Sequence, residues 1–221
     1  MVKNIFFIEA GMLKTAFFLL SLVFSHSCLS QAVAHPEFRG FLVDMSRLSP
    51  EQRKALTPSY IEQLKVIESV GLPAEMLAFM RTIPIFADPD FSAPGTHALY
   101  RRKNATPKPK GQVVTDLIPM ESKRPILLHE MLHAYDANKW DFNNATVLAA
   151  YERALSEKLY PPSAVKSHFL SNPREYFAIS GTVYLVGQIQ QEPFNCKLIV
   201  KNQPKYVEFL EQLFGKHSHC G

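Results

Sequence analysis

The sequence predicts an α+β domain, and three observations support this fold class. Helical patterns come first, over about residues 50–80. Three β-like segments follow at 82–87, 97–102 and 112–118, and helical patterns then continue from residue 122 almost to the end. Strands and helices that are segregated along the chain are typical of α+β domains. With 47% hydrophobic and 20% charged residues, the 221-residue chain can bury a globular core.

The first 34 residues have the features of a secretory signal peptide. Lys14 precedes an apolar run over residues 16–24, and Ala-Val-Ala at 32–34 is a small-x-small cleavage site. The apolar run is too short to cross a bilayer, which takes about 20 residues. We therefore expect a secreted or periplasmic protein with no membrane span after cleavage. Met12 is an alternative translation start, because the residues before it add little to a signal.

Cleavage after residue 34 leaves two cysteines, Cys196 and Cys220. Because exported proteins reach an oxidising compartment, we expect these two to form a disulfide that ties the C-terminal tail to the domain. The alternative is a pair of free thiols.

Residues 35–80 form the predicted N-terminal helical segment. Ser49 can cap a helix that has Pro50 in its first turn and Gln52 at the capping-box position. A second helix is predicted over 58–70, where apolar residues recur at helical spacing before Gly71.

Residues 81–221 form the second predicted part of the chain, packed with the N-terminal segment as one unit. A loop rich in proline and lysine, 103–111, separates the second and third strands. The helices that follow are predicted at about 125–138, 145–159, 173–190 and 204–214.

The helix predicted at 125–138 contains the pattern H-E-x-x-H, made by His129, Glu130 and His133. Residues four apart lie on one helix face, so two imidazoles can reach one zinc ion and the glutamate can act as a base. The flanking residues are almost all apolar, which indicates a buried helix: Ile126, Leu127, Leu128, Met131 and Leu132. Buried histidines need a partner, and this argues against a chance motif on a solvated helix.

The residues alone leave the third metal ligand open. The longer pattern H-E-x-x-H-x-x-G-x-x-H fails, because Asp136 and Lys139 occupy the glycine and third histidine positions. A glutamate on a later helix is the alternative, and Glu152 and Glu175 both qualify. Glu175 also fits the third position of a capping box that starts at Asn172, so its carboxylate has a structural alternative.

Two segments resemble the catalytic core of the anthrax-lethal-factor-like peptidases and the related Pro-Pro endopeptidases. They are Leu-His-Glu-Met-Leu-His-Ala-Tyr-Asp at 128–136 and Asn-Pro-Arg-Glu-Tyr-Phe-Ala at 172–178. The resemblance covers about residues 80–190 in the order of elements, and only these two motifs in detail.

These families are gluzincins, and the resemblance implies a zincin-like fold with zinc bound by His129, His133 and Glu175. It also implies that Glu130 is the catalytic base, and that Asp136 orients a histidine.

Two positions depart from this family pattern. The family carries a tyrosine that stabilises the oxyanion seven residues before the ligand glutamate, and this chain has His168 there. A histidine can donate the same hydrogen bond, so we take His168 as the candidate oxyanion donor, with Tyr160 or Tyr184 as substitutes. The family's second glutamate, four residues after the ligand, is Ile179 here.

The sequence therefore predicts a secreted zinc metallopeptidase that acts on peptides or proteins. The alternative is a secreted binding module whose zinc site is structural or degenerate, with Asp136 or His168 as a fourth ligand. A chance motif in a secreted helical protein is the third option. The net charge of +4 is too small, and the basic residues too scattered, to predict a nucleic-acid partner. Nothing in the sequence predicts an oligomeric state.

Overall fold

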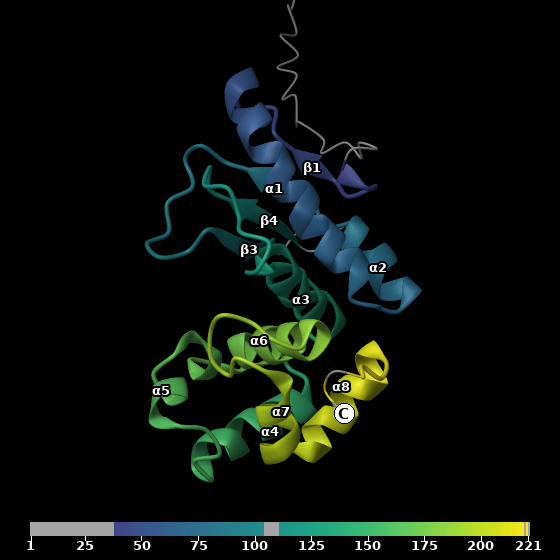
Figure 1. Ribbon diagram of the computed structural model, residues 1–221, viewed down its shortest axis with the longest axis vertical. Helices are drawn as coiled ribbons and strands as arrows, with labels where there is room; N and C mark the ends of the chain where they lie inside the picture. Colours follow the sequence, from purple (N-terminus) through teal and green to yellow (C-terminus); the bar gives the residue numbers. More distant parts are fainter. Residues whose placement is uncertain (1–37, 104–110, 219, 221) are drawn as a thin grey trace, which may run out of the picture.

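The computed structural model describes residues 38–103, 111–218 and 220 (Figure 1). The predicted signal peptide and most of the predicted 103–111 loop lie outside these residues. The elements in chain order are β1 (Val43–Asp44), α1 (Pro50–Ser69), α2 (Ala74–Arg81), β2 (Ile85–Ala87), β3 (Ala98–Arg102), β4 (Gly111–Thr115), α3 (Ile126–Lys139), α4 (Ala145–Ser156), α5 (Pro162–Val165), the 3-10 helix η2 (His168–Leu170), α6 (Pro173–Val186), α7 (Cys196–Asn202) and α8 (Pro204–Phe214).

The four strands form one small sheet in the order β1-β2-β4-β3. β1, β2 and β4 are parallel, with Val43 opposite Ile85 and Ile85 opposite Val113. β3 is antiparallel to β4, with Ala98 opposite Thr115. A small sheet beside helices agrees with the predicted α+β class. β3 is an edge strand, because it pairs only with β4 among the described residues.

One continuous helix, α1, replaces the two helices predicted on either side of residue 58. Pro58 lies inside this helix, where proline removes a backbone hydrogen bond at a cost of about 3 kcal/mol. Leu56, Tyr60 and Leu64 are all fully or almost fully buried on one face of the helix. Burying each such side chain contributes roughly 1.5–3 kcal/mol, so tertiary packing outweighs the proline.

The ends of the helices follow local signals. The predicted capping box is present: Ser49 Oγ accepts a hydrogen bond from the Gln52 amide, and Gln52 Oε1 accepts one from the Ser49 amide. The helix predicted to reach residue 190 ends at Val186, because Gly187 has a φ of 83°. Four short elements were not predicted: β1, α5, η2 and α7.

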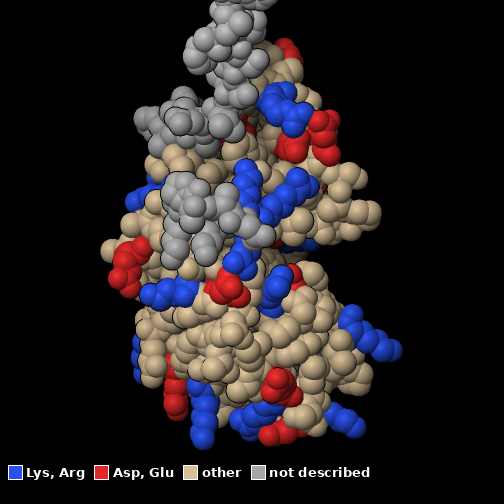
Figure 2. Space-filling model, turned by 180° about the vertical axis from the view of Figure 1, so that it is seen from behind, with Lys and Arg blue, Asp and Glu red and all other residues tan. Residues whose placement is uncertain are grey.

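α3 lies between two halves of the molecule (Figure 1). The sheet, α1 and α2 form one half, and α4 to α8 form the other. One cluster of buried side chains extends from Phe38 to Cys220 and so includes both halves. The outline is indented between the halves, and the face seen in Figure 2 carries basic and acidic side chains together.

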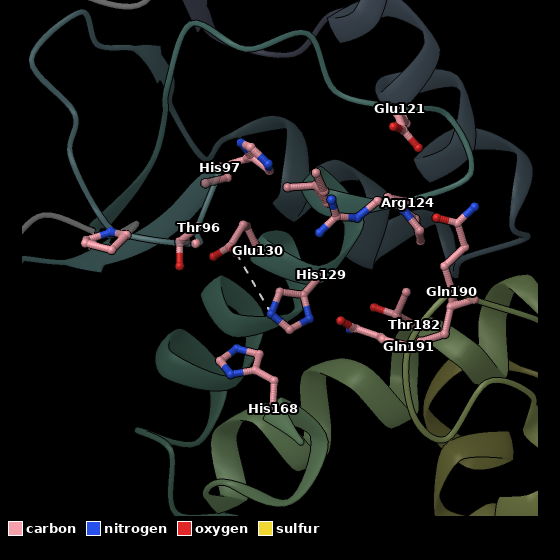
Figure 3. A pocket seen from close by; sticks show the side chains of 16 residues that line it. Thr96, His97, Glu121, Arg124, His129, Glu130, His168, Thr182, Gln190 and Gln191 are labelled. Atoms are coloured by element: carbon pink, nitrogen blue, oxygen red, sulfur yellow. Dashed lines mark ion pairs between the residues drawn. The ribbon is translucent and has the colours of Figure 1, made fainter. Parts of the chain in front are cut away.

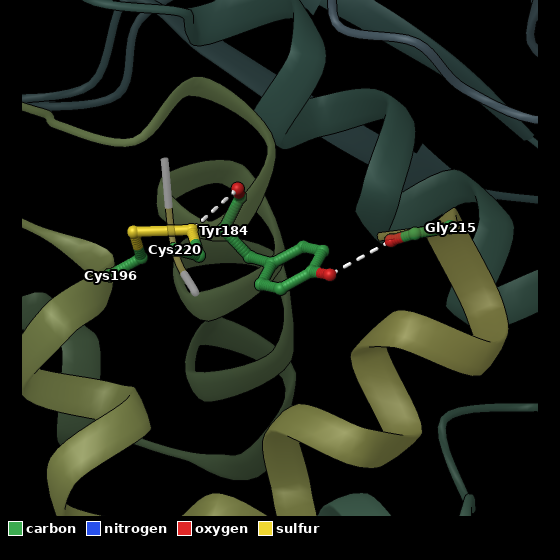
Figure 4. The surroundings of a disulfide bond; sticks show 4 residues. All are labelled: Tyr184, Cys196, Gly215 and Cys220. Carbon is green, nitrogen blue, oxygen red and sulfur yellow. Dashed lines mark hydrogen bonds between the residues drawn. A yellow bond between two sulfur atoms is a disulfide. The ribbon is translucent and has the colours of Figure 1, made fainter. Parts of the chain in front are cut away.

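The predicted disulfide between Cys196 and Cys220 is confirmed, with the two Cα atoms 5.4 Å apart. Cys220 Sγ also lies 3.1 Å from the Tyr184 carbonyl oxygen, and the Tyr184 hydroxyl donates to the Gly215 carbonyl (Figure 4). The C-terminal tail is therefore fastened to the end of α6. None of the helices in the described ranges is long and apolar enough to cross a membrane.

Candidate metal centre

The motif helix α3 is held at its start by a glutamine from α1. Gln63 is fully buried, and its Oε1 accepts a hydrogen bond from the Leu127 amide at 3.1 Å. Its Nε2 donates to the carbonyl oxygens of Glu121 and Arg124, both at 2.7 Å. Pro125 offers no side-chain cap, so Gln63 satisfies an amide that the helix start leaves open. This fixes the position from which the H-E-x-x-H residues project.

Glu175 enters the site from the first turn of α6. Asn172 Oδ1 accepts hydrogen bonds from the amides of Arg174 and Glu175, and Pro173 occupies the first helical position. The Glu175 carboxylate contacts histidine nitrogens instead of completing the capping box. The capping alternative therefore accounts for the helix start but not for this carboxylate.

His129, His133 and Glu175 converge in space. The two histidine Nε2 atoms are 3.1 Å apart. Glu175 Oε2 lies 3.2 Å from His129 Nε2, and Oε1 lies 3.2 Å from His133 Nε2. Ligands at zinc distances of about 2.0–2.2 Å in a tetrahedron are about 3.3 Å from one another. The spacing of these atoms matches that requirement.

His168 joins the same group from η2. Its Nε2 lies 2.8 Å from Glu175 Oε2, and its side chain is 62% exposed. The ligand atoms of His129, His168 and Glu175 lie within 4.8 Å of one another, so these three residues could hold a metal ion. The contact with the Glu175 carboxylate raises the pKa of His168 above its usual value.

The electrostatics of Glu175 suit a cation. Burial alone would raise its pKa, but the three imidazoles around it hold the pKa well below its usual value. Its Oε2 atom is buried without a hydrogen bond of normal geometry, as is His129 Nδ1. Buried polar atoms need partners, and two imidazoles with a carboxylate are a donor set that zinc prefers. The residues present therefore fit a metal ion.

Glu130 lies beside this group and is itself buried. Its Oε2 accepts a hydrogen bond from the Tyr100 amide at 2.6 Å, and its Oε1 is 3.9 Å from His129 Nε2. Burial raises the pKa of Glu130 to about 7, although His129 and the Tyr100 amide lower it. A carboxyl with a pKa near neutrality can both accept and donate a proton at physiological pH.

The other predicted candidates lie elsewhere. Glu152 is exposed on α4 and takes no part in the histidine group. Asp136 is buried, and no hydrogen bond joins it to a histidine among the described residues. The hydroxyl of Tyr160 donates to Gln203 Oε1 and that of Tyr184 to the Gly215 carbonyl. Neither tyrosine faces the metal group in this structure.

A cavity of about 640 Å³ opens over the group. His129, Glu130 and His168 line it, and the residues just before β3 and α3 form two of its walls (Figure 3). Gln190 and Gln191 from the segment after α6 line a further wall. No local sequence pattern marks these two glutamines or Arg124, because they meet only through the fold.

Comparison of the chain with protein-family models, with curated proteins and with solved structures finds no match. We therefore infer the function from the geometry of the site and from the two sequence motifs.

Proposed function

We propose that the chain is a secreted zinc-dependent metallopeptidase of the gluzincin type, as the resemblance to the lethal-factor-like and Pro-Pro endopeptidases implies. The observation that carries the proposal is the convergence of His129, His133 and Glu175, from two separate helices, beside the buried carboxyl of Glu130. The signal-like N-terminus and the disulfide support the secreted location.

In this proposal His129, His133 and Glu175 hold the zinc ion. Zinc supplies Lewis acidity that polarises a carbonyl and lowers the pKa of water towards 7. The low pKa of Glu175 keeps this ligand ionised, and the buried flanks of α3 keep both imidazoles in place. The role of these residues is therefore to bind and orient.

Glu130 handles the proton. The hydrogen bond from the Tyr100 amide fixes Oε2, which leaves Oε1 on the side of His129. In this mechanism Oε1 takes a proton from the attacking water and passes it to the leaving nitrogen. The burial that raises the pKa of Glu130 to about 7 suits both steps. His168 is the proposed donor to the oxyanion.

The edge strand β3 favours a peptide substrate. Its outer side faces the cavity, since His97 and Ala98 line it and the Tyr100 amide reaches Glu130. An extended peptide can add to a sheet edge through main-chain hydrogen bonds. A peptide bound in this way would run next to the proposed base.

A closed structural zinc site is the second candidate, and the position of His168 favours it. Its Nε2 is close enough to Glu175 for it to act as a fourth protein ligand. Structural zinc sites are closed by four protein ligands, whereas catalytic sites leave one position to water. The exposure of His168 favours the catalytic alternative, because an exposed side chain can move away from Glu175.

The first experiment measures zinc per chain in the full mature protein and in Glu175→Ala and Glu152→Ala variants. We expect one zinc in the wild type, a loss with Glu175→Ala and no change with Glu152→Ala. Loss of zinc with Glu152→Ala alone would identify Glu152 as the third ligand and remove the basis of the family resemblance. Absence of zinc in the wild type, after its addition, would contradict the proposal.

The second experiment compares hydrolysis of peptide mixtures by the wild type and by Glu130→Gln. General acid-base catalysis contributes about 10²–10⁴-fold, so we expect a rate loss of this size with zinc retained. His168→Ala serves as the companion variant. Weaker zinc binding in His168→Ala would identify His168 as a ligand and support the structural site, whereas slower turnover at full zinc content would support its catalytic role.

A further inference from the structure

Among the described residues, the cavity beside the metal group is lined by an arginine, Arg124, that has no ionic partner. Among its ionisable lining residues, His97 Nδ1 lies 2.8 Å from Asp116 Oδ2, and Glu130 accepts a hydrogen bond from the Tyr100 amide. No ion pair within 4.0 Å joins Arg124 to a carboxylate in the described part of the chain, and this includes Glu121, which lines the same cavity. Figure 3 shows the Arg124 side chain directed from the start of α3 into the cavity.

Arg124 differs in this respect from most of the arginines that the structure describes. Five others form ion pairs: Arg39, Arg47, Arg81, Arg102 and Arg153. Two more lie over aromatic rings: Arg101 and Arg174. An arginine that faces a cavity without a carboxylate partner is available for a ligand.

The backbone at Arg124 is held rigidly. Its carbonyl oxygen accepts hydrogen bonds from Gln63 Nε2 and from the Ile126 amide, both at 2.7 Å, and its amide donates to the Glu121 carbonyl at 3.1 Å. Gln63 is fully buried in the core. The guanidinium therefore projects from a fixed point directly before the metal-binding helix, which limits the orientations that must be lost when it binds.

Another wall of the same cavity adds neutral hydrogen-bond donors, the side-chain amides of Gln190 and Gln191. Gln190 and Gln191 belong to a closed loop in which the Ile189 amide donates to the Phe194 carbonyl and Gln188 pairs with Asn195. The disulfide at Cys196 directly follows this loop. Primary amides donate hydrogen bonds to carboxylate oxygens as readily as they accept them from other groups.

We infer that Arg124, with Gln190 and Gln191, forms a subsite that binds a carboxylate of the peptide substrate. A guanidinium donates two parallel hydrogen bonds to a carboxylate, and this geometry selects against neutral amides. The carboxylate belongs either to an Asp or Glu side chain near the cleaved bond or to the C-terminus of the peptide. The inference rests on the proposed peptidase function, because the subsite opens onto the same metal group.

Paired peptides test this subsite in the zinc-loaded full chain. One pair differs only by Glu or Gln at a single position, and a second pair differs only by a free or amidated C-terminus. Charge-assisted hydrogen bonds contribute about 1.5–3 kcal/mol, so Arg124→Gln should lower kcat/KM about 10–100-fold for the carboxylate member alone. The loss should appear mainly in KM. The pair that shows the effect identifies the source of the carboxylate.

Lys123→Gln is the matched control. It removes the same charge one residue earlier, and Lys123 lines a different cavity. We expect its kcat/KM for both members of each pair to match the wild type. An equal fall in Arg124→Gln for acidic and neutral peptides, or an equal effect of Lys123→Gln, would overturn the inference.

A binding measurement separates this inference from the proposed function. The same labelled peptides are titrated into zinc-loaded Glu130→Gln protein, with and without Arg124→Gln, and followed by fluorescence anisotropy. If the wild type hydrolyses no peptide but binding still requires both the carboxylate and Arg124, the subsite is supported and the peptidase function is refuted. Hydrolysis without preference for either carboxylate would refute the subsite alone.

Discussion

Gly181 sets how closely α3 and α6, the two helices that carry the proposed metal ligands, approach each other. It lies on α6, and a Cβ atom built there would be 3.0 Å from Leu132 Cδ1 on α3 and 3.3 Å from Phe214. Leu132 is fully buried and directly precedes His133. We therefore expect Gly181→Ala to push α3 away from α6, and with it the histidines away from Glu175.

The expected magnitude follows from two opposing effects. Alanine in place of glycine stabilises a helix by about 1 kcal/mol. Overpacking a filled core costs about 1–3 kcal/mol, and here the neighbours must move by a few tenths of an ångström. The net loss of stability is up to about 2 kcal/mol. Zinc ligand distances tolerate shifts of about 0.2 Å, so 1 kcal/mol of strain at the site would weaken zinc binding about fivefold.

Urea denaturation and zinc competition against a chelator measure these two quantities. Leu132→Val removes the methyl group that the new Cβ approaches, so in that background Gly181→Ala should lose most of its cost. A Gly181→Ala protein that is about 1 kcal/mol more stable than the wild type and binds zinc equally well would refute the reasoning.

Three further predictions concern stability. Replacing Cys196 and Cys220 by serine opens a loop with a sequence separation of 24 and should lower the free energy of unfolding by about 3 kcal/mol in urea without reductant; an unchanged midpoint would contradict it. Asn172→Ala should lower stability by about 1 kcal/mol through the lost helix cap, and Asn172→Asp should not, as thermal melts can show. Burial raises the pKa of Asp136 from 3.8 to about 7, so the native state keeps a proton that the unfolded state loses. The free energy of unfolding of the wild type should therefore fall relative to that of Asp136→Asn as pH rises from about 4 to about 7, by up to roughly 4 kcal/mol. Above pH 7 the difference should stay constant. A difference that does not change with pH at all would contradict the prediction.

The features that the sequence predicts well are those set by neighbouring residues. The spacing of His129 and His133 places both on one face of α3 whatever surrounds the helix. The capping residues Ser49 and Asn172 begin α1 and α6 where predicted, because their hydrogen bonds reach only two or three residues along the chain. The disulfide is predicted from the count of cysteines and the expected oxidising compartment.

The features that the sequence does not predict depend on distant contacts. β1 has two residues and exists only because it pairs with β2. Pro58 signals a break, yet core burial carries α1 through it. Gln63 is one polar residue among many until the fold buries it at the start of α3. Arg124 and the two glutamines line one cavity, but they come from segments far apart in the sequence that share no repeating pattern.

The hydrogen bonds of Gln63 determine which part of the chain can be separated from the rest. A recombinant chain shortened to residues 81–221 would keep every proposed ligand but lose β1, α1 and this glutamine. The Leu127 amide would then lose its partner, at about 1–3 kcal/mol if it stays buried, and the Glu121 and Arg124 carbonyls would each keep only a backbone hydrogen bond. Removal of the segment before β2 would therefore take away a support of α3, so a recombinant domain should begin ahead of β1.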